Sequence, residues 1–297
     1  MPSIRPLRWA PVLVVAVACA AAGCRSAAPP AARAGGGAPA PASERTYEEL
    51  RALLWFQTAE EHRQIRIATF RAAERALAAA LADPTWSAVG QGPEAASLPP
   101  AVITDVDETL LDNSDFEGGM LRAGKAFNDA DWSAWVEARR ARALPGALEF
   151  ARFAAAHGVT LFYVTNRDEP YEPATRDNLA REGFPLRDDV DVILLRGERP
   201  EWVSDKESRR RLVAASYRVV LQLGDDLNDF VSGVDRAPVA ARRAIADAHA
   251  ELFGSRWFVL PNPLYGSWQR ALTAGQSAPA DAAEALRREL DRVRAFP

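Results

Sequence analysis

The sequence predicts an α/β protein with a parallel, Rossmann-like sheet that helices cover on both faces. Short apolar segments that suit buried strands alternate along the chain with longer segments that suit helices, which is typical of such sheets. Polar residues directly follow several of these apolar segments, and ligands of parallel sheets bind beyond the carboxyl ends of the strands. The 297 residues, 48% of them hydrophobic, are enough for one large domain.

The predicted elements run from an N-terminal helical region to a last strand near the C-terminus. Thr46 and Glu49 have the spacing of a capping box, and the helical pattern behind them ends at Asp83 and Pro84. Residues 116–144 are polar with scattered aromatics and predict a small helical insertion, which would act as a cap. Further helices are predicted at 147–157 and 173–183, and strands at 101–104, 159–164, 190–195, 219–223 and 257–260.

The N-terminus predicts export and a lipid anchor. Arg5 and Arg8 precede an apolar run over residues 10–22, which is shorter than the ~20 residues of a membrane-spanning helix and is typical of a signal peptide. Small residues before Cys24 resemble the lipobox of bacterial lipoproteins, in which that cysteine becomes the acylated first residue. Cys19 is a second candidate for lipidation, and an ordinary secretory signal is the alternative.

These features divide the chain into three parts. We predict a lipoprotein signal peptide over residues 1–23, a flexible linker rich in Ala, Pro and Gly over 24–45, and one folded domain over 46–297. The predicted location is the bacterial cell envelope, with the protein held by its lipid at the outer membrane or on the periplasmic face.

The composition excludes several kinds of site and partner. Both cysteines lie in the first 24 residues, so the domain contains no disulfide framework, no cysteine-ligated zinc and no cysteine nucleophile. A formal net charge of −4 does not favour binding to a nucleic acid polymer. Only Lys125 and Lys206 are lysines, and we interpret the excess of arginine as codon bias rather than function.

The first polar cluster follows the strand predicted at 101–104. Asp105 and Asp107 point to the same side of an extended segment. Two carboxylates in that position repel each other unless a cation lies between them or one keeps its proton. One can then attack as a nucleophile while the other transfers a proton. An Asp- and Thr-rich turn or helix cap is the alternative interpretation.

Three further clusters lie at strand ends or at a helix start. Thr165 and Asn166 follow the second predicted strand and can donate hydrogen bonds to a phosphoryl oxygen. Lys206 begins a predicted helix and can neutralise both a carboxylate and a phosphate. Asp225 and Asp229 lie in an Asp-rich segment after the fourth strand, and their hard oxygen atoms suit Mg²⁺. Each has a plainer alternative: turn residues, a surface lysine or an Asp-rich turn.

The order of the four clusters resembles the four motifs of the haloacid dehalogenase-like phosphohydrolases. Within that superfamily the chain is similar to the class C acid phosphatases, the outer-membrane lipoprotein e (P4) family. The similar segments are 105–114, 165–167, 224–230 and the C-terminal signature at 261–268. Gln269 departs from the family, which commonly has Glu there. The resemblance extends roughly over residues 46–275 and implies a haloacid dehalogenase core.

The resemblance also implies an activity and catalytic roles. It implies a Mg²⁺-dependent acid phosphatase and 5′-nucleotidase that hydrolyses phosphomonoesters through an aspartyl-phosphate intermediate. Asp105 would be the nucleophile, and Asp107 would protonate the leaving alcohol and then activate water. Thr165 and Lys206 would bind the phosphoryl oxygens, with Asn166 as a helper.

Metal and substrate contacts follow from the same resemblance. Mg²⁺ would be bound by Asp105, the backbone carbonyl of Asp107 and Asp225, while Asp229 would order its water ligands. Further contacts concern the leaving group: two aromatic residues match positions at which the family stacks a nucleobase or another aromatic leaving group, namely Trp132 and Tyr265.

Alternatives remain at the sequence level. Trp132 and Tyr265 could instead be packing residues, and Trp135 competes with Trp132 for the stacking position. The three histidines fall in predicted helices and are interpreted as structural or exposed. The same phospho-aspartate could serve a phosphotransferase, and a catalytically silent surface-binding lipoprotein could keep the fold. The oligomeric state stays open, a homodimer included.

Overall fold

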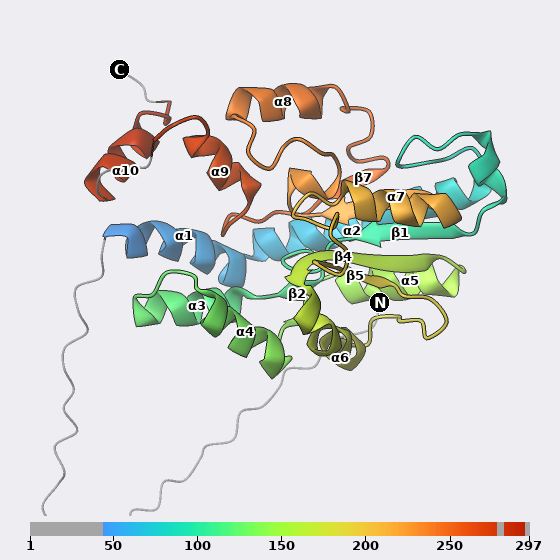
Figure 1. Ribbon diagram of the computed structural model, residues 1–297, viewed down its shortest axis with the longest axis horizontal. Helices are drawn as coiled ribbons and strands as arrows, with labels where there is room; N and C mark the ends of the chain where they lie inside the picture. Colours follow the sequence, from blue (N-terminus) through green and yellow to red (C-terminus); the bar gives the residue numbers. More distant parts are fainter. Residues whose placement is uncertain (1–43, 278–281, 295–297) are drawn as a thin grey trace, which may run out of the picture. The chain divides into compact units, whose positions relative to one another are not determined.

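A five-stranded parallel sheet lies at the centre of the computed structural model, which describes residues 44–277 and 282–294. The strand order is β5-β4-β1-β6-β7 (Figure 1). This architecture confirms the predicted α/β class and its parallel sheet. The strands are β1 (Pro100–Thr104), β4 (Thr160–Asp168), β5 (Ile193–Arg196), β6 (Arg218–Gly224) and β7 (Trp257–Val259).

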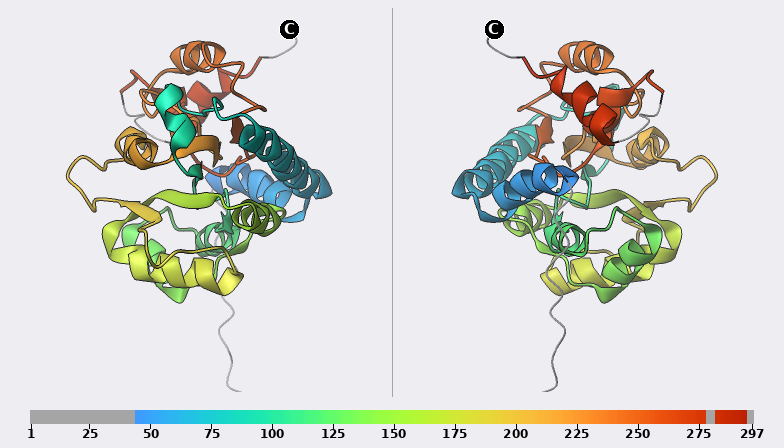
Figure 2. Two further views of the ribbon diagram at one scale, coloured as in Figure 1. Left: turned by 90° about the vertical axis from the view of Figure 1, so that its right-hand side faces the viewer. Right: turned by 90° about the vertical axis from the view of Figure 1, so that its left-hand side faces the viewer.

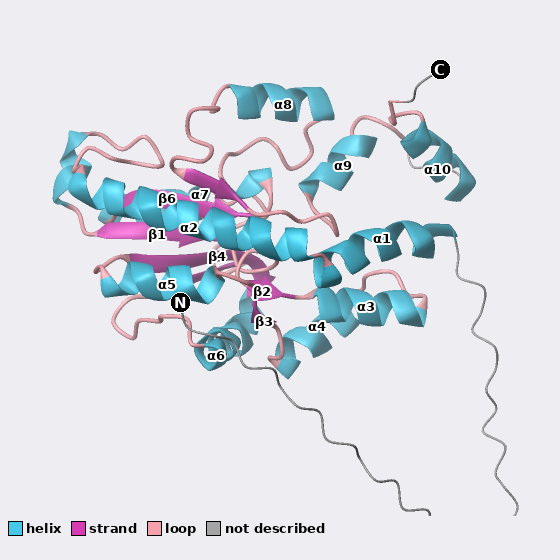
Figure 3. Ribbon diagram, turned by 180° about the vertical axis from the view of Figure 1, so that it is seen from behind, coloured by secondary structure: helices cyan, strands magenta, loops and turns pink. Residues whose placement is uncertain are grey.

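Helices cover both faces of this sheet. On one face α2 (Glu60–Ala82) packs beside α5 (Ala147–Ala156). Both helices lie in front of the sheet in Figure 3. On the other face α7 (Glu207–Ser216) packs against β4 and β6 (Figure 1). At the sheet edge α6 (Glu172–Glu182) contacts β5. Since both faces are covered, the strands are almost entirely apolar and buried, as in β6.

The N-terminal helical region differs from the prediction in two details. It consists of two helices, α1 (Glu44–Thr58) and α2, separated at Ala59, whose backbone is extended. Acidic residues favour the first turn of a helix, and Glu60 and Glu61 begin α2 in this way. Because α1 starts at Glu44, Thr46 lies inside the helix, and the predicted capping box at Thr46 is wrong.

The insertion between β1 and β4 contains two helices and a small sheet. The helices are α3 (Ser114–Ala123) and α4 (Asp129–Ala138). The helical insertion was predicted at 116–144, so in the structure it begins two residues earlier than predicted. The prediction missed two short strands, β2 (Leu111–Asp112) and β3 (Arg142–Ala143), which pair antiparallel at the base of the insertion. Strands of two residues carry no alternating pattern that a sequence could reveal.

Two predicted strand boundaries were also wrong. β4 was predicted to end at residue 164, but it continues to Asp168, which pairs with Arg196 of β5 after a shift in register. An ion pair supports this extension, since Arg196 Nε lies 2.7 Å from Asp168 Oδ1. β5 begins only at Ile193, three residues later than predicted. The other predicted helices and strands match to within a residue or two.

Besides the edge strand β7, the C-terminal part of the chain contains helices. They are α8 (Val239–Asp247), α9 (Ser267–Thr273) and α10 (Ala282–Leu290). In both views of Figure 2 these helices and the insertion lie on opposite sides of α1 and α2. Within the described residues the chain also forms three short 3₁₀ helices: Pro93–Ser97, Glu169–Tyr171 and Leu227–Asp229.

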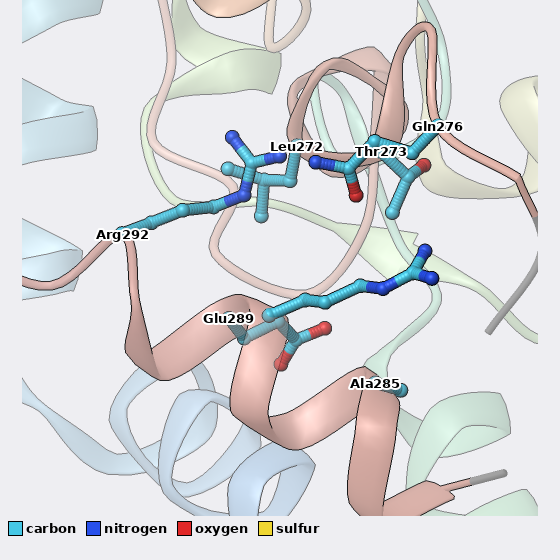
Figure 4. Close-up of a pocket in the computed structure, with 7 residues that line it drawn as sticks. Leu272, Thr273, Gln276, Ala285, Glu289 and Arg292 are labelled. Carbon is cyan, nitrogen blue, oxygen red and sulfur yellow. The ribbon is translucent and has the colours of Figure 1, made fainter.

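A small cavity of about 30 Å³ lies between α9 and α10 (Figure 4). No residue that lines it comes from the polar clusters at the strand ends, so it does not belong to the candidate site. The lining residues are Leu272, Thr273, Gln276, Ala285, Arg288, Glu289 and Arg292.

Several predictions concern residues outside the described part of the chain. The signal peptide over 1–23, the lipidation of Cys24 and nearly all of the linker predicted at 24–45 fall there. The described residues lie within one compact unit. Among them, no helix combines the length and the apolar character needed to cross a membrane.

Candidate active site

The carboxyl ends of three central strands bring the polar clusters together. In the sheet register, Thr104 of β1 is paired with Tyr163 of β4 on one side and with Leu223 of β6 on the other. The clusters that follow these residues therefore meet at one edge of the sheet. The backbone N–H of Asp105 donates to the Leu223 carbonyl at 3.0 Å, which attaches the first cluster to the end of β6.

Three carboxylates form the centre of the site. Asp105, Asp225 and Asp229 each offer one oxygen, and these oxygens lie within 4.8 Å of one another. The Lys206 ammonium lies among them, donating to Asp105 Oδ1 and, at 2.6 Å, to Asp229 Oδ1. One ammonium does not balance three carboxylates. Closely spaced hard oxygen ligands with this excess of negative charge suit a divalent cation such as Mg²⁺.

Burial shifts the pKa values of this cluster. It raises the pKa of Asp105 to about 7 and that of Asp229 to about 7, although Lys206 opposes both shifts. Burial and the neighbouring Asp229 raise the pKa of Asp225 to about 6. For Lys206, burial would lower the pKa, but the two carboxylates outweigh it and raise the pKa. The carboxylates are therefore destabilised as anions, and a cation between them would favour the charged forms.

Asp107 lies beside this cluster and is held by neighbouring donors. Arg167 donates to Asp107 Oδ1 from Nε at 3.0 Å and from Nη2 at 2.8 Å. Asn113 Nδ2 donates to the same oxygen at 2.9 Å, and Thr165 Oγ1 donates to Oδ2 at 3.3 Å. The Arg167 side chain is only 1% exposed, so the position of Asp107 is set from inside the protein.

The chain turns sharply after Asp107. Glu108 adopts a left-handed conformation with φ of 54°, which costs a residue with a side chain about 1–2 kcal/mol. Its carboxyl group is fully buried and accepts from the Asn113 backbone N–H at 2.8 Å. Burial, with Asp107 and Asp225 nearby, raises the pKa of Glu108 well above its usual value. The turn places the Thr109 hydroxyl on Asp225 Oδ1 at 2.9 Å.

The C-terminal signature at 261–268 is attached to the Asp-rich turn. Asn262 Nδ2 donates to Asp225 Oδ2 at 2.8 Å, so both oxygens of Asp225 have a side-chain donor. The Ser267 backbone N–H and hydroxyl both donate to the carboxylate of Asp226. Gly224, the last residue of β6, is needed for close approach, because a Cβ there would collide with the Asp229 carboxylate.

Comparison with known proteins identifies the family. The chain matches the family model of the HAD superfamily, subfamily IIIB (acid phosphatase), over residues 52–268, a range that contains all four clusters. The chain belongs to the subfamily IIIB acid phosphatases. Members of this family are phosphomonoester hydrolases with the haloacid dehalogenase core that the sequence predicts.

Solved structures support this assignment. The class C acid phosphatase from Bacillus anthracis is 32% identical, with a TM-score of 0.72 over 85% of this chain and 99% of that one. The structure of that class C acid phosphatase with tungstate bound gives a TM-score of 0.73 at the same identity and coverage. These matches confirm the resemblance to class C acid phosphatases.

A curated relative matches over a shorter range. Acid phosphatase 1 of Solanum lycopersicum is 28% identical over 167 residues, which make up 55% of this chain and 57% of that protein. The chain thus spans a little more than half the length of this relative.

Asn166 occupies a supporting position in this acid phosphatase. Its Nδ2 donates to the Ser204 carbonyl at 3.0 Å, and its Oδ1 accepts from Arg209 Nη2 at 2.7 Å. Arg209 is fully buried and also donates to the Thr165 carbonyl at 2.5 Å. The amide of Asn166 therefore links β4 to the segment before Lys206.

The aromatic candidates occupy different surroundings. The Trp132 ring packs edge-on against Phe116, and the Arg167 guanidinium lies 5.7 Å from its centre, so Trp132 lies next to the group that holds Asp107. By contrast, the indole N–H of Trp135 donates to Asn113 Oδ1 at 2.8 Å and is used internally. Tyr265 is partly exposed, in the segment between the contacts of Asn262 and Ser267.

The histidines have structural positions. His62 is buried on α2, His157 is exposed at the end of α5, and His249 stacks on Trp257 with ring centres 5.2 Å apart. Gln269, at the position where the family commonly has Glu, is exposed and donates to the Leu264 carbonyl at 3.2 Å.

Sequence reasoning missed the arginines. At least some of the arginine excess serves the site, because four buried arginines hydrogen-bond to its loops: Arg66, Arg167, Arg209 and Arg210. Arg167 follows the Thr165-Asn166 pair, and Arg209 and Arg210 follow Lys206 by one helical turn. Closeness to a motif is a signal that could have marked these three, whereas nothing in the sequence around Arg66 points to the site.

Proposed function

We propose that the protein hydrolyses phosphomonoesters with the help of a divalent metal ion, Mg²⁺ by the chemistry of its ligands. The observation that carries this proposal is the cluster of Asp105, Asp225 and Asp229 around Lys206 at the carboxyl end of the sheet. Carboxylate oxygens and an ammonium at one point suit a phosphoryl group and its metal ion. Tungstate, named in one of the related structures, is a tetrahedral oxyanion like phosphate and supports an oxyanion site in this fold.

Asp105 is the nucleophile in the proposed reaction. Its carboxylate attacks phosphorus, the bond to the ester oxygen breaks, and an aspartyl phosphate forms. Asp107 gives a proton to the departing alkoxide, which leaves as an alcohol. It then takes a proton from the water that attacks the aspartyl phosphate, and this releases phosphate and restores Asp105. Lys206 and the Thr165 hydroxyl offset the charge on the phosphoryl oxygens.

The metal ion would be held by Asp105, the backbone carbonyl of Asp107 and Asp225, with Asp229 at its water ligands. When bound, it supplies positive charge to the transferring group. Thr109 and Asn262 orient the two oxygens of Asp225 toward this role.

Aromatic phosphomonoesters and nucleoside 5′-monophosphates are the proposed substrate class. Support comes from Trp132, which lies on the Arg167 guanidinium beside Asp107 and therefore near the point where a leaving group departs. A stacked base or phenyl ring requires only an exposed aromatic face, which several leaving groups share. The proposed location is the cell envelope, through a lipid on Cys24.

A phosphate-release assay tests the proposed function. The purified protein should release phosphate from p-nitrophenyl phosphate with Mg²⁺ and lose this activity with a chelator. Asp105→Asn should abolish turnover while the unfolding temperature stays close to that of the wild type, because an amide does not attack phosphorus. If a preparation of Asp105→Asn that contains no deamidated protein keeps near wild-type activity, the aspartyl-phosphate mechanism is wrong.

A further inference from the structure

Arg66 of α2 is a fully buried guanidinium whose partners lie far away in the sequence. Its exposure is 0%, and its Nη2 donates to the carbonyl of Glu108 at 2.7 Å and to the carbonyl of Pro261 at 3.0 Å. Its Nε donates to His62 Nε2 at 2.7 Å, one helical turn earlier. A buried charge is costly to keep, so these contacts call for an explanation.

The two carbonyls have a common feature. Each belongs to the residue just before a donor to Asp225: Thr109 follows Glu108 and donates to Oδ1, and Asn262 follows Pro261 and donates to Oδ2. One nitrogen of Arg66 therefore joins the two segments whose side chains hold the two oxygens of the same carboxylate. These segments lie more than 150 residues apart in the chain.

The location of α2 makes this connection available. α2 lies between the insertion side and the C-terminal side of the molecule (Figure 2). The backbone of Glu108 is in the left-handed region, so the turn that presents Thr109 is not a conformation the chain would favour unaided. Burial lowers the pKa of Arg66 to about 10, and the carboxylate that most strongly opposes this shift is Asp225.

We propose that Arg66 is a positioning residue for Asp225: it holds the two backbone segments that orient this carboxylate for the metal ion. The inference rests on the metal site of the proposed function. Removing a group that orients a metal ligand typically weakens metal binding about 10–100-fold. Arg66 makes no hydrogen bond to Asp225 itself. It therefore acts on Asp225 through Thr109 and Asn262.

The chain offers a matched control in Arg218. This arginine is also buried, and its Nη1 donates to three backbone carbonyls, those of Ala80, Asp83 and Trp86. It lies at the amino end of β6, the opposite end from Asp225. In each arginine one buried nitrogen has no hydrogen-bond partner within the described residues, Nη1 in Arg66 and Nε in Arg218.

The test measures binding of Mg²⁺ alone by calorimetry, together with the unfolding temperature, in Arg66→Met and Arg218→Met. Both variants should unfold at lower temperature than the wild type. The dissociation constant for Mg²⁺ should rise about 10–100-fold in Arg66→Met and stay within about twofold of the wild type in Arg218→Met. An unchanged constant in a folded Arg66→Met would overturn the positioning role. If Arg66→Met does not fold, Arg66→Lys is the second variant: it keeps the charge but has a single donor nitrogen. An unchanged dissociation constant for Mg²⁺ in Arg66→Lys would likewise overturn the positioning role.

A double-variant cycle shows whether the effect passes through the predicted contact. If Arg66 acts through Asn262, the loss of Mg²⁺ affinity in Arg66→Met with Asn262→Ala should be at least about fivefold smaller than the product of the two single losses. Losses that multiply would contradict this route. Wild-type protein that binds no Mg²⁺ would instead refute the metal site of the proposed function, and the inference with it.

Discussion

Asp107 accepts hydrogen bonds from three side chains, and this surrounding determines what the residue can do. Arg167, Asn113 and Thr165 donate to the two carboxylate oxygens, while the Asp107 side chain stays 16% exposed. An acid–base group works best when its position is fixed before the substrate arrives. Arg167, the buried arginine that follows the motif residues Thr165 and Asn166, fixes the position of Asp107.

The proposed acid–base role of Asp107 predicts that the effect of losing this residue depends on the leaving group. In Asp107→Asn the specificity constant should fall about 10²–10⁴-fold for an alkyl phosphate such as glycerol phosphate, since general acid catalysis is lost. The fall should be at least about tenfold smaller for p-nitrophenyl phosphate, because p-nitrophenolate leaves readily without a proton. Steady-state kinetics on both substrates measures this. Equal losses would mean that Asp107 only supports the structure.

At the scale of elements, two helices hold the loops of the site through hydrogen bonds. α7 begins directly after Lys206, and one turn later its Arg209 and Arg210 donate to the backbone of β4 and of the Asp-rich turn. On the other face of the sheet, α2 uses the i,i+4 spacing of His62 and Arg66 to place an imidazole against a guanidinium. Both helices thus hold loops that are distant in the sequence.

His62 of α2 makes the stability of the folded protein depend on pH. Burial lowers the pKa of His62 to about 4 from an ordinary value of 6.5, and the charge of Arg66 adds to this shift. As the pH falls, the unfolded chain takes up the proton first, so the folded state loses stability between about pH 6.5 and pH 4. The expected loss from this residue is on the order of 2 kcal/mol.

His62→Gln isolates this contribution, since glutamine keeps an acceptor for Arg66 but does not titrate. Urea unfolding at pH 7, 5.5 and 4 should show that the wild type loses more stability than the variant over this range. Comparing the two proteins at each pH removes the effect of the carboxylates with raised pKa values, which act in the opposite direction. Parallel pH profiles would show that His62 does not cause the acid sensitivity.

At the scale of the whole molecule, two outer segments lie next to the proposed site. The insertion supplies Trp132 beside Arg167, and the C-terminal signature carries Tyr265 between its contacts to Asp225 and Asp226. The proposed attack by Asp105 does not depend on the shape of the leaving group. We therefore expect discrimination between substrates to come from these two outer segments.

Substrate choice tests this expectation. Trp132→Ala and Tyr265→Ala should each lower the specificity constant for adenosine 5′-monophosphate roughly ten- to hundredfold, because losing one stacking face costs about 1–3 kcal/mol. The constant for glycerol phosphate should hardly change. If both substrates suffer equally, the residues serve packing, and the phosphatase has no stacking basis for preferring nucleotides.

The proposed lipid anchor gives a prediction for the protein in the cell. Cys24→Ser should release the protein from the membrane fraction or stall its processing, because no thiol is left to acylate at the predicted cleavage site. Cys19→Ser is the matched control and should stay membrane-bound and processed. A mature N-terminus well beyond residue 24 without an acyl chain, measured by mass spectrometry, would contradict the anchor.

The fold and the four clusters could be predicted because they depend on local patterns. An apolar segment followed by Asp105 and Asp107 predicts a buried strand with carboxylates at its end, whatever surrounds it. Boundaries that depend on a partner strand were missed, such as the continuation of β4 to Asp168, which needs the pairing with Arg196. The break between α1 and α2 was missed because it lacks a Gly or Pro to mark it.

The sequence by itself determined the class of fold, the order of the clusters and the carboxylates proposed to react, since side-chain chemistry and strand periodicity are carried by neighbouring residues. Only the tertiary structure decided how those carboxylates are held. Arg66 looks like any helical arginine in the sequence, yet its partners Glu108 and Pro261 lie 42 and 195 residues away. Burial and hydrogen bonding between distant segments exist only once the chain has folded, so no local pattern records them.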